Sequence, residues 1–210
     1  MINDVPIKAL LIDADGVIQH ATRDWTKEFK TLFGFPDTAT ALKFTNDVYT
    51  AETLTLTTGT GFGNELEKVM AKWRLQDKAD QVIDVMYAIT RHEENLSVFK
   101  SLRQKGIVCC VASNQQTGRA RHMSENLGYR GLFDHELYSY RFGAAKPNQK
   151  FFTSALTIIG HDPCSTLFID DREENVAGAR RAGLNAELYN AAAGADTLRA
   201  LLRNYGLTDS

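Results

Sequence analysis

The chain has 210 residues, of which 43% are hydrophobic and 24% are charged, and its formal net charge is −2. These values are typical of one large globular domain, or of a core that carries a smaller insertion. The slight negative charge argues against a general binder of nucleic acids or membrane surfaces, because both are polyanions. The sequence shows neither a run of about 18 apolar residues nor the basic start of a signal peptide. We therefore expect no nucleic-acid partner and no membrane partner.

The three cysteines of the chain do not suggest a disulfide framework. Cys109 and Cys110 are adjacent in an apolar run, and neighbours on a strand point to opposite faces of a sheet. We interpret these two as buried apolar side chains, and Cys164 stands alone in the sequence. Free cysteines are typical of a reducing compartment, so the sequence predicts a cytoplasmic protein.

The first predicted strand, residues 7–12, ends at a pair of acids. The segment is short and apolar, and Asp13, Asp15 and Gly16 follow it, which is typical of a buried parallel strand. Open α/β sheets bind ligands at the carboxyl ends of such strands. Two acids this close repel each other unless a cation lies between them, although a simple Asp-Gly turn would use the same residues.

Helical periodicity dominates the next part of the chain, from about residue 19 to residue 91. Apolar residues recur there at helical spacing, with charged residues between them. The loop 53–64 contains G-x-G-x-G at 59–63, but no strand with the required fingerprint precedes it, so we predict a flexible loop rather than a phosphate-binding one. The predicted helices cover residues 22–33, 38–53, 64–74 and 78–90.

From residue 94 onward, predicted helices alternate with predicted strands, which favours a doubly wound, mainly parallel sheet. We therefore expect an α/β core formed by residues 1–18 and 92–210, with residues 19–91 inserted over its site as an all-helical unit. Pro147 is expected in the first turn of a helix. The later predicted strands cover residues 107–112, 136–139, 166–169 and 186–189. The predicted helices of this part begin near residues 94, 117, 147, 173 and 195.

Polar side chains follow several of the apolar strands, and parallel strands would bring them to one edge of the sheet. Each group also has an ordinary interpretation, as a helix cap, a surface charge or a turn. Their joint occurrence favours a shared site. Several carboxylates around one point suit Mg²⁺, while a hydroxyl, backbone amides and a lysine suit a phosphoryl group. The candidate residues are Asp13, Asp15, Ser113, Asn114, Lys146, Asp170 and Asp171.

Four segments that contain these candidate residues resemble the motifs of a known family. DADGV at 13–17, ASN at 112–114, KP at 146–147 and FIDDREENVAGARRAG at 168–183 resemble, in order and spacing, the four motifs of the haloacid dehalogenase (HAD) superfamily. The helical block resembles the small cap of that superfamily's first subclass, which includes sugar phosphatases, phosphoglycolate phosphatases and β-phosphoglucomutases. The resemblance covers the whole chain and implies a Rossmann-like core with an inserted cap domain. Val17 departs from it, since many relatives have threonine there.

The resemblance implies a role for each candidate residue. Asp13 would be the nucleophile, and Asp15 the general acid and base. Ser113 and the backbone amide of Asn114 would bind phosphoryl oxygens, and Lys146 would pair with both Asp13 and the phosphate.

A metal site is implied by the same likeness. Mg²⁺ would be held by Asp13, by the backbone carbonyl of Asp15 and by Asp171, with Asp170 acting through a metal-bound water. The likeness therefore implies Mg²⁺ as the cofactor.

A small phosphate ester is the substrate that the resemblance implies. The expected reaction is Mg²⁺-dependent hydrolysis of a phosphorylated metabolite, with a sugar phosphate favoured, through an aspartyl-phosphate intermediate. Asp15 argues against dehalogenation, because a departing halide needs no proton. Two alternatives stay open, a phosphomutase of the β-phosphoglucomutase type and a non-catalytic phosphate-sensing or signalling domain. The sequence does not indicate the oligomeric state.

Overall fold

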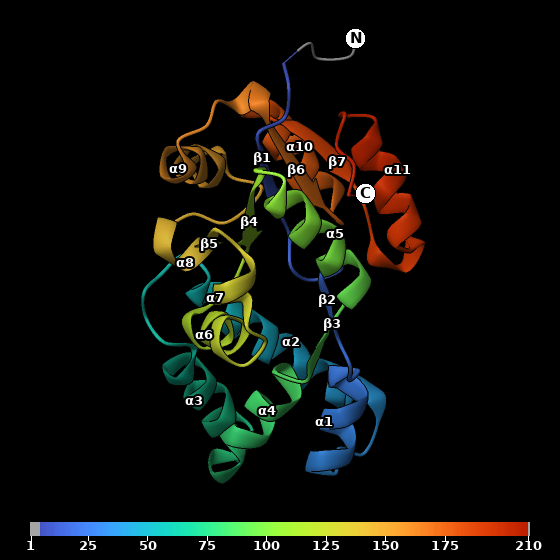
Figure 1. Ribbon diagram of the computed structural model, residues 1–210. Coiled ribbons are helices and arrows are strands. Elements are labelled where there is room, and N and C mark those ends of the chain that lie inside the picture. Colours follow the sequence, from blue (N-terminus) through green and yellow to red (C-terminus); the bar gives the residue numbers. More distant parts are fainter. Residues whose placement is uncertain (1–4, 210) are drawn as a thin grey trace.

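A five-stranded parallel sheet organises the core in the computed structural model, which describes residues 5–209 (Figure 1). The strand order is β5-β4-β1-β6-β7, so the first strand of the chain lies at the centre. This arrangement confirms the predicted α/β fold with a parallel sheet. The strands are β1 (Ala9–Ile12), β4 (Val108–Ser113), β5 (His135–Tyr138), β6 (Thr166–Asp170) and β7 (Asn185–Leu188).

Both faces of this sheet are covered, which explains why its central strands are apolar without alternation. Leu10 and Ile12 of β1 belong to the hydrophobic cluster on one face, which also includes side chains of α5 and α11. Ala9 and Leu11 belong to the cluster on the other face, with side chains of α9 and α10. These helices are α5 (Glu93–Gln104), α9 (Gln149–Ile159), α10 (Glu173–Arg181) and α11 (Ala195–Arg203).

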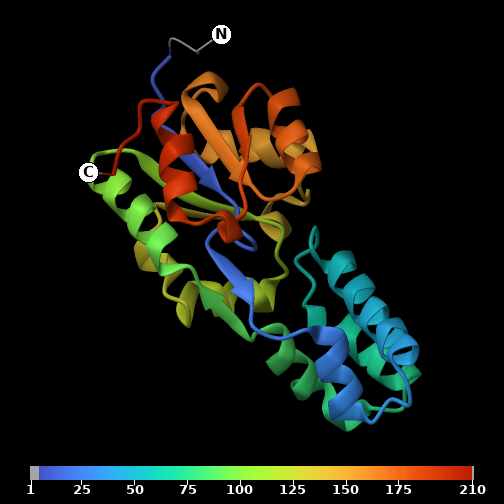
Figure 2. The same cartoon turned by 90° about the vertical axis from the view of Figure 1, so that its right-hand side faces the viewer.

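Four helices at the opposite end of the molecule form a second unit, which we call the helical block (residues 22–88; Figure 2). It has an interior of its own that is rich in aromatic rings. Phe44 is fully buried there and makes edge contacts with the rings of Phe29 and Trp73. The helices are α1 (Trp25–Phe33), α2 (Thr38–Thr55), α3 (Phe62–Lys72) and α4 (Ala79–Met86), with a 3₁₀ turn at Gln76–Lys78.

Two short strands, which the sequence did not predict, connect the helical block to the core. β2 (Gln19–Ala21) and β3 (Ile89–Arg91) pair antiparallel, with Gln19 opposite Arg91. Each strand has only three residues, and their pairing joins segments about seventy residues apart. No local periodicity of the sequence therefore predicts these strands. The chain therefore leaves and re-enters the core through one ribbon (Figure 1).

Several predicted boundaries need correction. Pro147 does not open a helix, because α9 begins at Gln149 and is capped by the side chain of Asn148, which accepts a hydrogen bond from the Lys150 amide. The predicted loop 53–64 shrinks to 56–61, since α2 continues to Thr55 and α3 begins at Phe62, whose ring is buried in the helical block. Three further helices complete the core, namely α6 (Thr117–Glu125), α7 (Tyr129–Leu132) and α8 (Ser139–Phe142).

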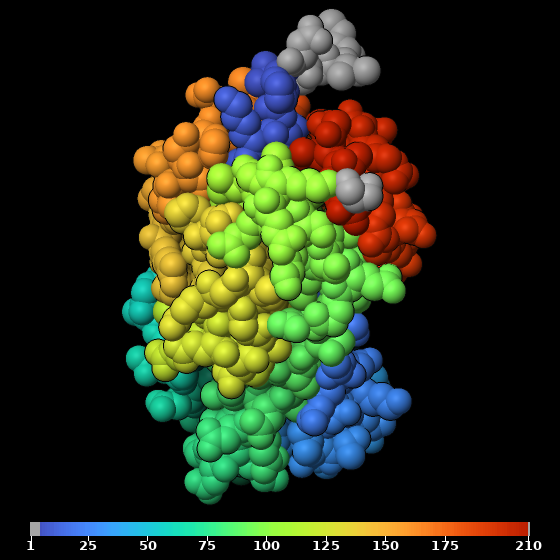
Figure 3. All heavy atoms as spheres, viewed as in Figure 1, coloured from blue at the N-terminus to red at the C-terminus, as the bar shows by residue number. Residues whose placement is uncertain are grey.

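The surface view shows the helical block at one end of the molecule and the segment containing α5, α6 and α7 covering the junction with the core on this face (Figure 3). Within residues 5–209, no helix combines the length and the apolar character needed to cross a bilayer. The three cysteines form no disulfide; Cys109 and Cys110 are buried and Cys164 is exposed.

Candidate active site

The carboxyl ends of β1, β4 and β6 meet at one point, because the register of the sheet aligns them. Ile12 lies opposite Val111 on one side and Ile169 on the other. The next residue, Asp13, donates its amide hydrogen to the Ile169 carbonyl at 2.9 Å and so continues the strand. Asp13 and Asp170 are therefore neighbours although they are far apart in the sequence.

Lys146 joins these two acids from the loop that precedes α9. Its Nζ donates to Asp13 Oδ1 at 2.7 Å, to Asp170 Oδ2 at 2.6 Å and to the Ala112 carbonyl at 2.8 Å. Burial disfavours the ammonium ion, but Asp13 and then Asp170 raise the pKa of Lys146 above its ordinary value. The lysine is therefore a fixed positive charge between two buried carboxylates.

Asn114 fixes the backbone of that lysine. Its Nδ2 donates to the Lys146 carbonyl at 2.9 Å, and its Oδ1 accepts from the Lys146 amide at 2.8 Å. The sequence reasoning considered only the backbone amide of Asn114 and missed this positioning contact. Ser113, buried beside it, has a hydroxyl that accepts from Gln115 Nε2 at 3.3 Å.

Three carboxylates gather where a cation could bind. Asp13, Asp170 and Asp171 each offer an oxygen, and these oxygens lie within 4.8 Å of one another. Burial raises the pKa of Asp13 to about 7, with Lys146 opposing the shift and Asp170 adding to it. Burial and then Asp170 also raise the pKa of Asp171. Crowded carboxylates of this kind favour a bound cation, which would hold them in the ionised form.

The donor set fits Mg²⁺, since all three side chains supply hard oxygen ligands. Gly16 helps to create the space: it adopts a positive φ of 80°, and a Cβ atom there would clash with the Asp171 carboxylate. Asp170 is held in place by Asn175 Nδ2, at 3.0 and 3.1 Å from its two oxygens, and by the Arg172 amide at 2.9 Å.

Asp15 lies outside this cluster of three acids and is surrounded by a set of donors that the sequence reasoning missed. Arg119 forms a two-pronged ion pair with it, Nη1 to Oδ2 at 2.7 Å and Nη2 to Oδ1 at 2.8 Å. Gln115 Nε2 donates to Oδ2 at 2.9 Å and Gln19 Nε2 to Oδ1 at 3.0 Å. Burial raises the pKa of Asp15, but Arg119, together with the hydrogen bonds from Gln19 and Gln115, lowers it below its ordinary value.

The sequence contains a weak indication that Arg119 is buried. Arg119 and Met123 are four residues apart and share the buried face of α6, so an arginine replaces an apolar residue in a helical stripe. Nothing local identifies its partner, because Asp15 lies 104 residues earlier in the chain.

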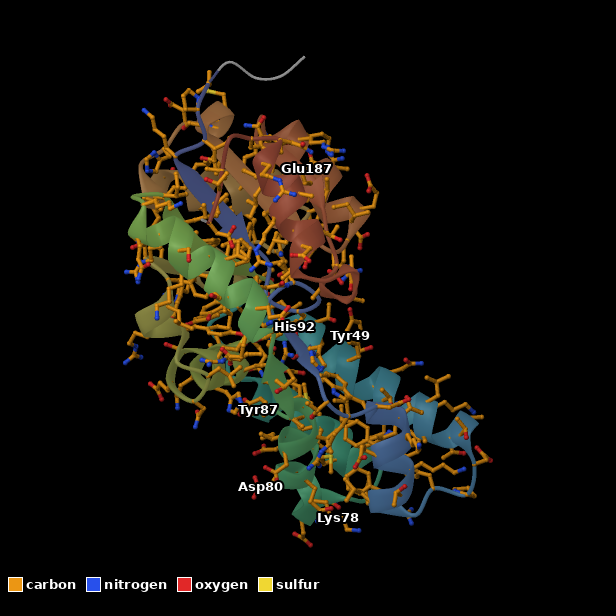
Figure 4. The ribbon with its side chains drawn as sticks, turned by 45° about the vertical axis from the view of Figure 1, so that its right-hand side comes forward. Tyr49, Lys78, Asp80, Tyr87, His92 and Glu187 are labelled. Carbon is orange, nitrogen blue, oxygen red and sulfur yellow. The ribbon has the colours of Figure 1, made fainter. Side chains whose placement is uncertain are left out.

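The helical block also contributes to the site. Glu52 of α2 is only 9% exposed; burial raises its pKa to about 6, with Arg119 lowering it and Asp15 raising it. Tyr49, on the same helix, faces Arg172 of the core; burial opposes the charge of Arg172, while Glu174 and then Tyr49 raise its pKa. Tyr49 and Tyr87 lie in the region where the block meets the core, whereas Lys78 and Asp80 lie at its far end (Figure 4).

Residues 7–183 match a family model described as a haloacid dehalogenase-like hydrolase. Over 109 residues the chain is 31% identical to glyceraldehyde 3-phosphate phosphatase of Methanothermobacter thermautotrophicus, a match that covers 51% of this chain and 48% of that protein. The chain thus spans about half the length of this curated relative. A longer match, 26% identical over 198 residues and 88% of both chains, is to phosphatase MT3486 of Mycobacterium tuberculosis.

Among solved structures, the fold is similar to that of the HAD family enzyme bt-2542 of Bacteroides thetaiotaomicron, in complex with magnesium and inorganic phosphate. The TM-score is 0.68 with 23% identity, over 87% of this chain and 93% of that one, and at this identity the likeness concerns the fold. The family model covers most of the chain, including the carboxyl ends of β1, β4 and β6. The chain therefore belongs to the haloacid dehalogenase-like hydrolase family.

Proposed function

We propose that this protein is a Mg²⁺-dependent phosphatase that hydrolyses a small phosphorylated metabolite, with a sugar phosphate as the favoured substrate. The observation that carries the proposal is the position of Asp13, which lies at the sheet edge beside Lys146 and among the carboxylates of Asp170 and Asp171. The phosphatase names of the relatives support it.

In the first step an Asp13 oxygen attacks phosphorus, and the bond between phosphorus and the ester oxygen breaks. Lys146, the Ser113 hydroxyl and the Asn114 amide offset the charge on the phosphoryl oxygens. Asp15 donates a proton to the departing alcohol oxygen. The alcohol leaves, and Asp13 carries the phosphoryl group.

In the second step water attacks the phosphorus of phosphorylated Asp13, and Asp15 takes a proton from that water. Inorganic phosphate leaves and the Asp13 carboxylate returns. The ion pair with Arg119 favours the ionised form of Asp15, which is the form that takes a proton from water in this second step. For the first step Asp15 must gain a proton from solvent before the ester bond breaks.

The residues that would hold Mg²⁺ are Asp13, Asp171 and the backbone carbonyl of Asp15, with Asp170 acting through a water. When bound, the metal would neutralise charge on the transferring group. Asp13 and Asp170 already share one ammonium ion, so the acid cluster as a whole keeps an excess of negative charge that a divalent cation would balance.

We assign residues 1–18 and 92–210 to a catalytic core and residues 19–91 to a cap that closes over it. The support is the β2–β3 ribbon at the two boundaries and the separate interior of the helical block. Closure of such a cap would exclude water and complete the site. A cytoplasmic location and the absence of nucleic-acid and membrane partners belong to the same proposal.

The test uses the wild-type protein with para-nitrophenyl phosphate and acetyl phosphate. We expect Mg²⁺-dependent release of inorganic phosphate, complete loss after EDTA treatment, recovery with Mg²⁺ and poor recovery with Ca²⁺, whose looser coordination disturbs in-line geometry. Full activity after exhaustive EDTA treatment would contradict the metal site.

The same assay, with sugar phosphates added to the substrates, separates the alternatives. A phosphate-sensing domain would accept phosphate from acetyl phosphate without rapid turnover. A phosphomutase would convert one phosphate ester of a sugar into its isomer with little release of inorganic phosphate.

A further inference from the structure

Glu52 is a buried carboxylate that the proposed reaction does not use. The residue is 9% exposed, and within residues 5–209 no hydrogen bond or ion pair engages its carboxylate. An ionised carboxylate is costly to bury without a partner. A ligand group that enters the site would supply the missing partner.

The position of Glu52 points to the part of the substrate that it would meet. Its charge acts on Arg119 and Asp15 of the core and on Tyr87 near the end of the helical block. Its helix, α2, runs toward the core (Figure 2). The loop that follows brings the Thr57 carbonyl close to Gly143. The carboxylate therefore lies between block and core, near the proposed acid and base.

Asp15 defines the leaving-group side of the site, because an acid that protonates the departing oxygen must face it. We propose, on the basis of the proposed phosphatase function, that Glu52 selects the alcohol part of the substrate. Its carboxylate accepts hydrogen bonds from a hydroxyl or ammonium group of that alcohol and repels an alcohol that carries a carboxylate.

Arg119 is a cation that could instead favour an alcohol with a carboxylate, but its guanidinium group already binds other side chains. Nη1 binds Asp15 and Gln115, and Nη2 binds Asp15. Its Nε is buried without a partner, and the side chain is 8% exposed. Lys146 is likewise held by Asp13 and Asp170. Arg119 and Lys146 are therefore each paired with carboxylates of the core, whereas the Glu52 carboxylate has no hydrogen-bond or ion-pair partner among residues 5–209.

The experiment compares glycerol 3-phosphate with 3-phosphoglycerate, which have the same length and differ in a terminal CH₂OH or carboxylate. We expect kcat/KM of the wild-type protein to favour glycerol 3-phosphate by at least tenfold, because juxtaposed like charges cost several kcal/mol. Glu52→Gln should reduce that ratio about tenfold, since it removes the charge but keeps an acceptor. A general loss of activity cancels in the ratio.

A matched control is Glu67→Gln, the same change at an exposed position of α3, which should keep the wild-type ratio. A second pair needs no variant: O-phosphoethanolamine and propyl phosphate differ in an ammonium or methyl terminus, and the wild-type protein should prefer the ammonium compound several-fold. This arm keeps the proposal testable if Glu52→Gln does not fold.

An unchanged ratio in Glu52→Gln, or a wild-type preference for the carboxylate ester, would overturn the proposal, and the latter would assign the alcohol site to Arg119. Failure of the phosphatase function is distinct, because the wild-type protein would then fail to hydrolyse even acetyl phosphate. Retained hydrolysis of acetyl phosphate without discrimination would leave that function intact and reject the role of Glu52.

Discussion

The core and the helical block differ in the burial of their ion-paired side chains. In the core, the basic side chains of the site are buried: Lys146 pairs with the buried acids Asp13 and Asp170, and Arg119 pairs with Asp15, whose side chain is 42% exposed. In the block, ion pairs lie at the surface: the Lys68 side chain of the Glu65 pair is 71% exposed, and the Lys72 side chain of the Asp47 pair is 64% exposed.

Glu52 is the exception in this comparison, a buried carboxylate of the block that has no hydrogen bond or ion pair within residues 5–209 and is influenced by the charges of Arg119 and Asp15 in the core. A buried charge lowers the stability of the fold unless it is paired, so an unpaired one indicates a function. Exposed ion pairs, in contrast, contribute little to stability. The difference indicates that chemistry is arranged in the core and that the block takes part in it where α2 meets the site. Three substitutions test this division.

Asp13→Asn should have the largest effect. It removes the proposed nucleophile and weakens the proposed metal site, so kcat should fall at least about a thousandfold while the fold remains. Steady-state kinetics and circular dichroism measure the two effects. Asp84→Asn, at an exposed position of the helical block, is the control and should keep wild-type kcat. If Asp13→Asn kept a tenth of wild-type kcat, that result would contradict the assignment of the catalytic residues to the core.

Asp15→Asn should have a smaller effect that depends on the leaving group. Sugar phosphates, whose alkoxides must be protonated, should lose about a hundredfold or more, whereas nitrophenyl and acyl phosphates should keep part of the first step. The second step should slow for every substrate, so phosphorylated Asp13 should accumulate. Mass spectrometry after acid quenching detects that adduct on the peptide that contains Asp13. Equal losses for good and poor leaving groups, without an adduct, would remove Asp15 from the proposed role.

Glu52→Gln should have the smallest effect on turnover; beside the change in substrate preference proposed above, we expect it to change the stability of the fold. The pKa of Glu52 is raised in the folded state from 4.5 to about 6, mainly by burial. Below pH 4.5 the carboxyl is protonated in both states and burial costs no charge. As the pH rises from 4.5 to about 6, the unfolded state ionises first, so the free energy of unfolding falls.

Above about pH 6 that loss is complete, and removal of the charge should stabilise the protein by up to about 2 kcal/mol. Urea unfolding at pH 7.5 and pH 4.5 measures it, with the gain expected only at the higher pH and Glu67→Gln as the control without a gain. A less stable variant at pH 7.5 would mean that Glu52 and Arg119 attract each other more strongly than burial opposes them, which would sharpen the comparison in favour of a pairing role.

The sequence by itself determined the layers of this protein. Continuous apolar runs predicted the three central strands β1, β4 and β6, because strands that are covered on both faces have no polar side. Those runs end at Asp13, Ser113 and Asp170, so the convergence of these residues follows from the parallel topology alone. Helical spacing likewise revealed α1 to α4, since each helix buries one stripe in a common interior.

The tertiary structure decided which polar side chains meet. Arg119 reaches Asp15 across 104 residues, and the Asn114 side chain holds Lys146 across 32 residues. The β2–β3 ribbon and the approach of Glu52 to the core depend equally on distant segments. Local patterns report whether a side chain is buried and where the chain turns. The partner of a buried charge is set by sheet register and helix packing between segments far apart in the sequence. No local periodicity of the sequence therefore predicts that partner.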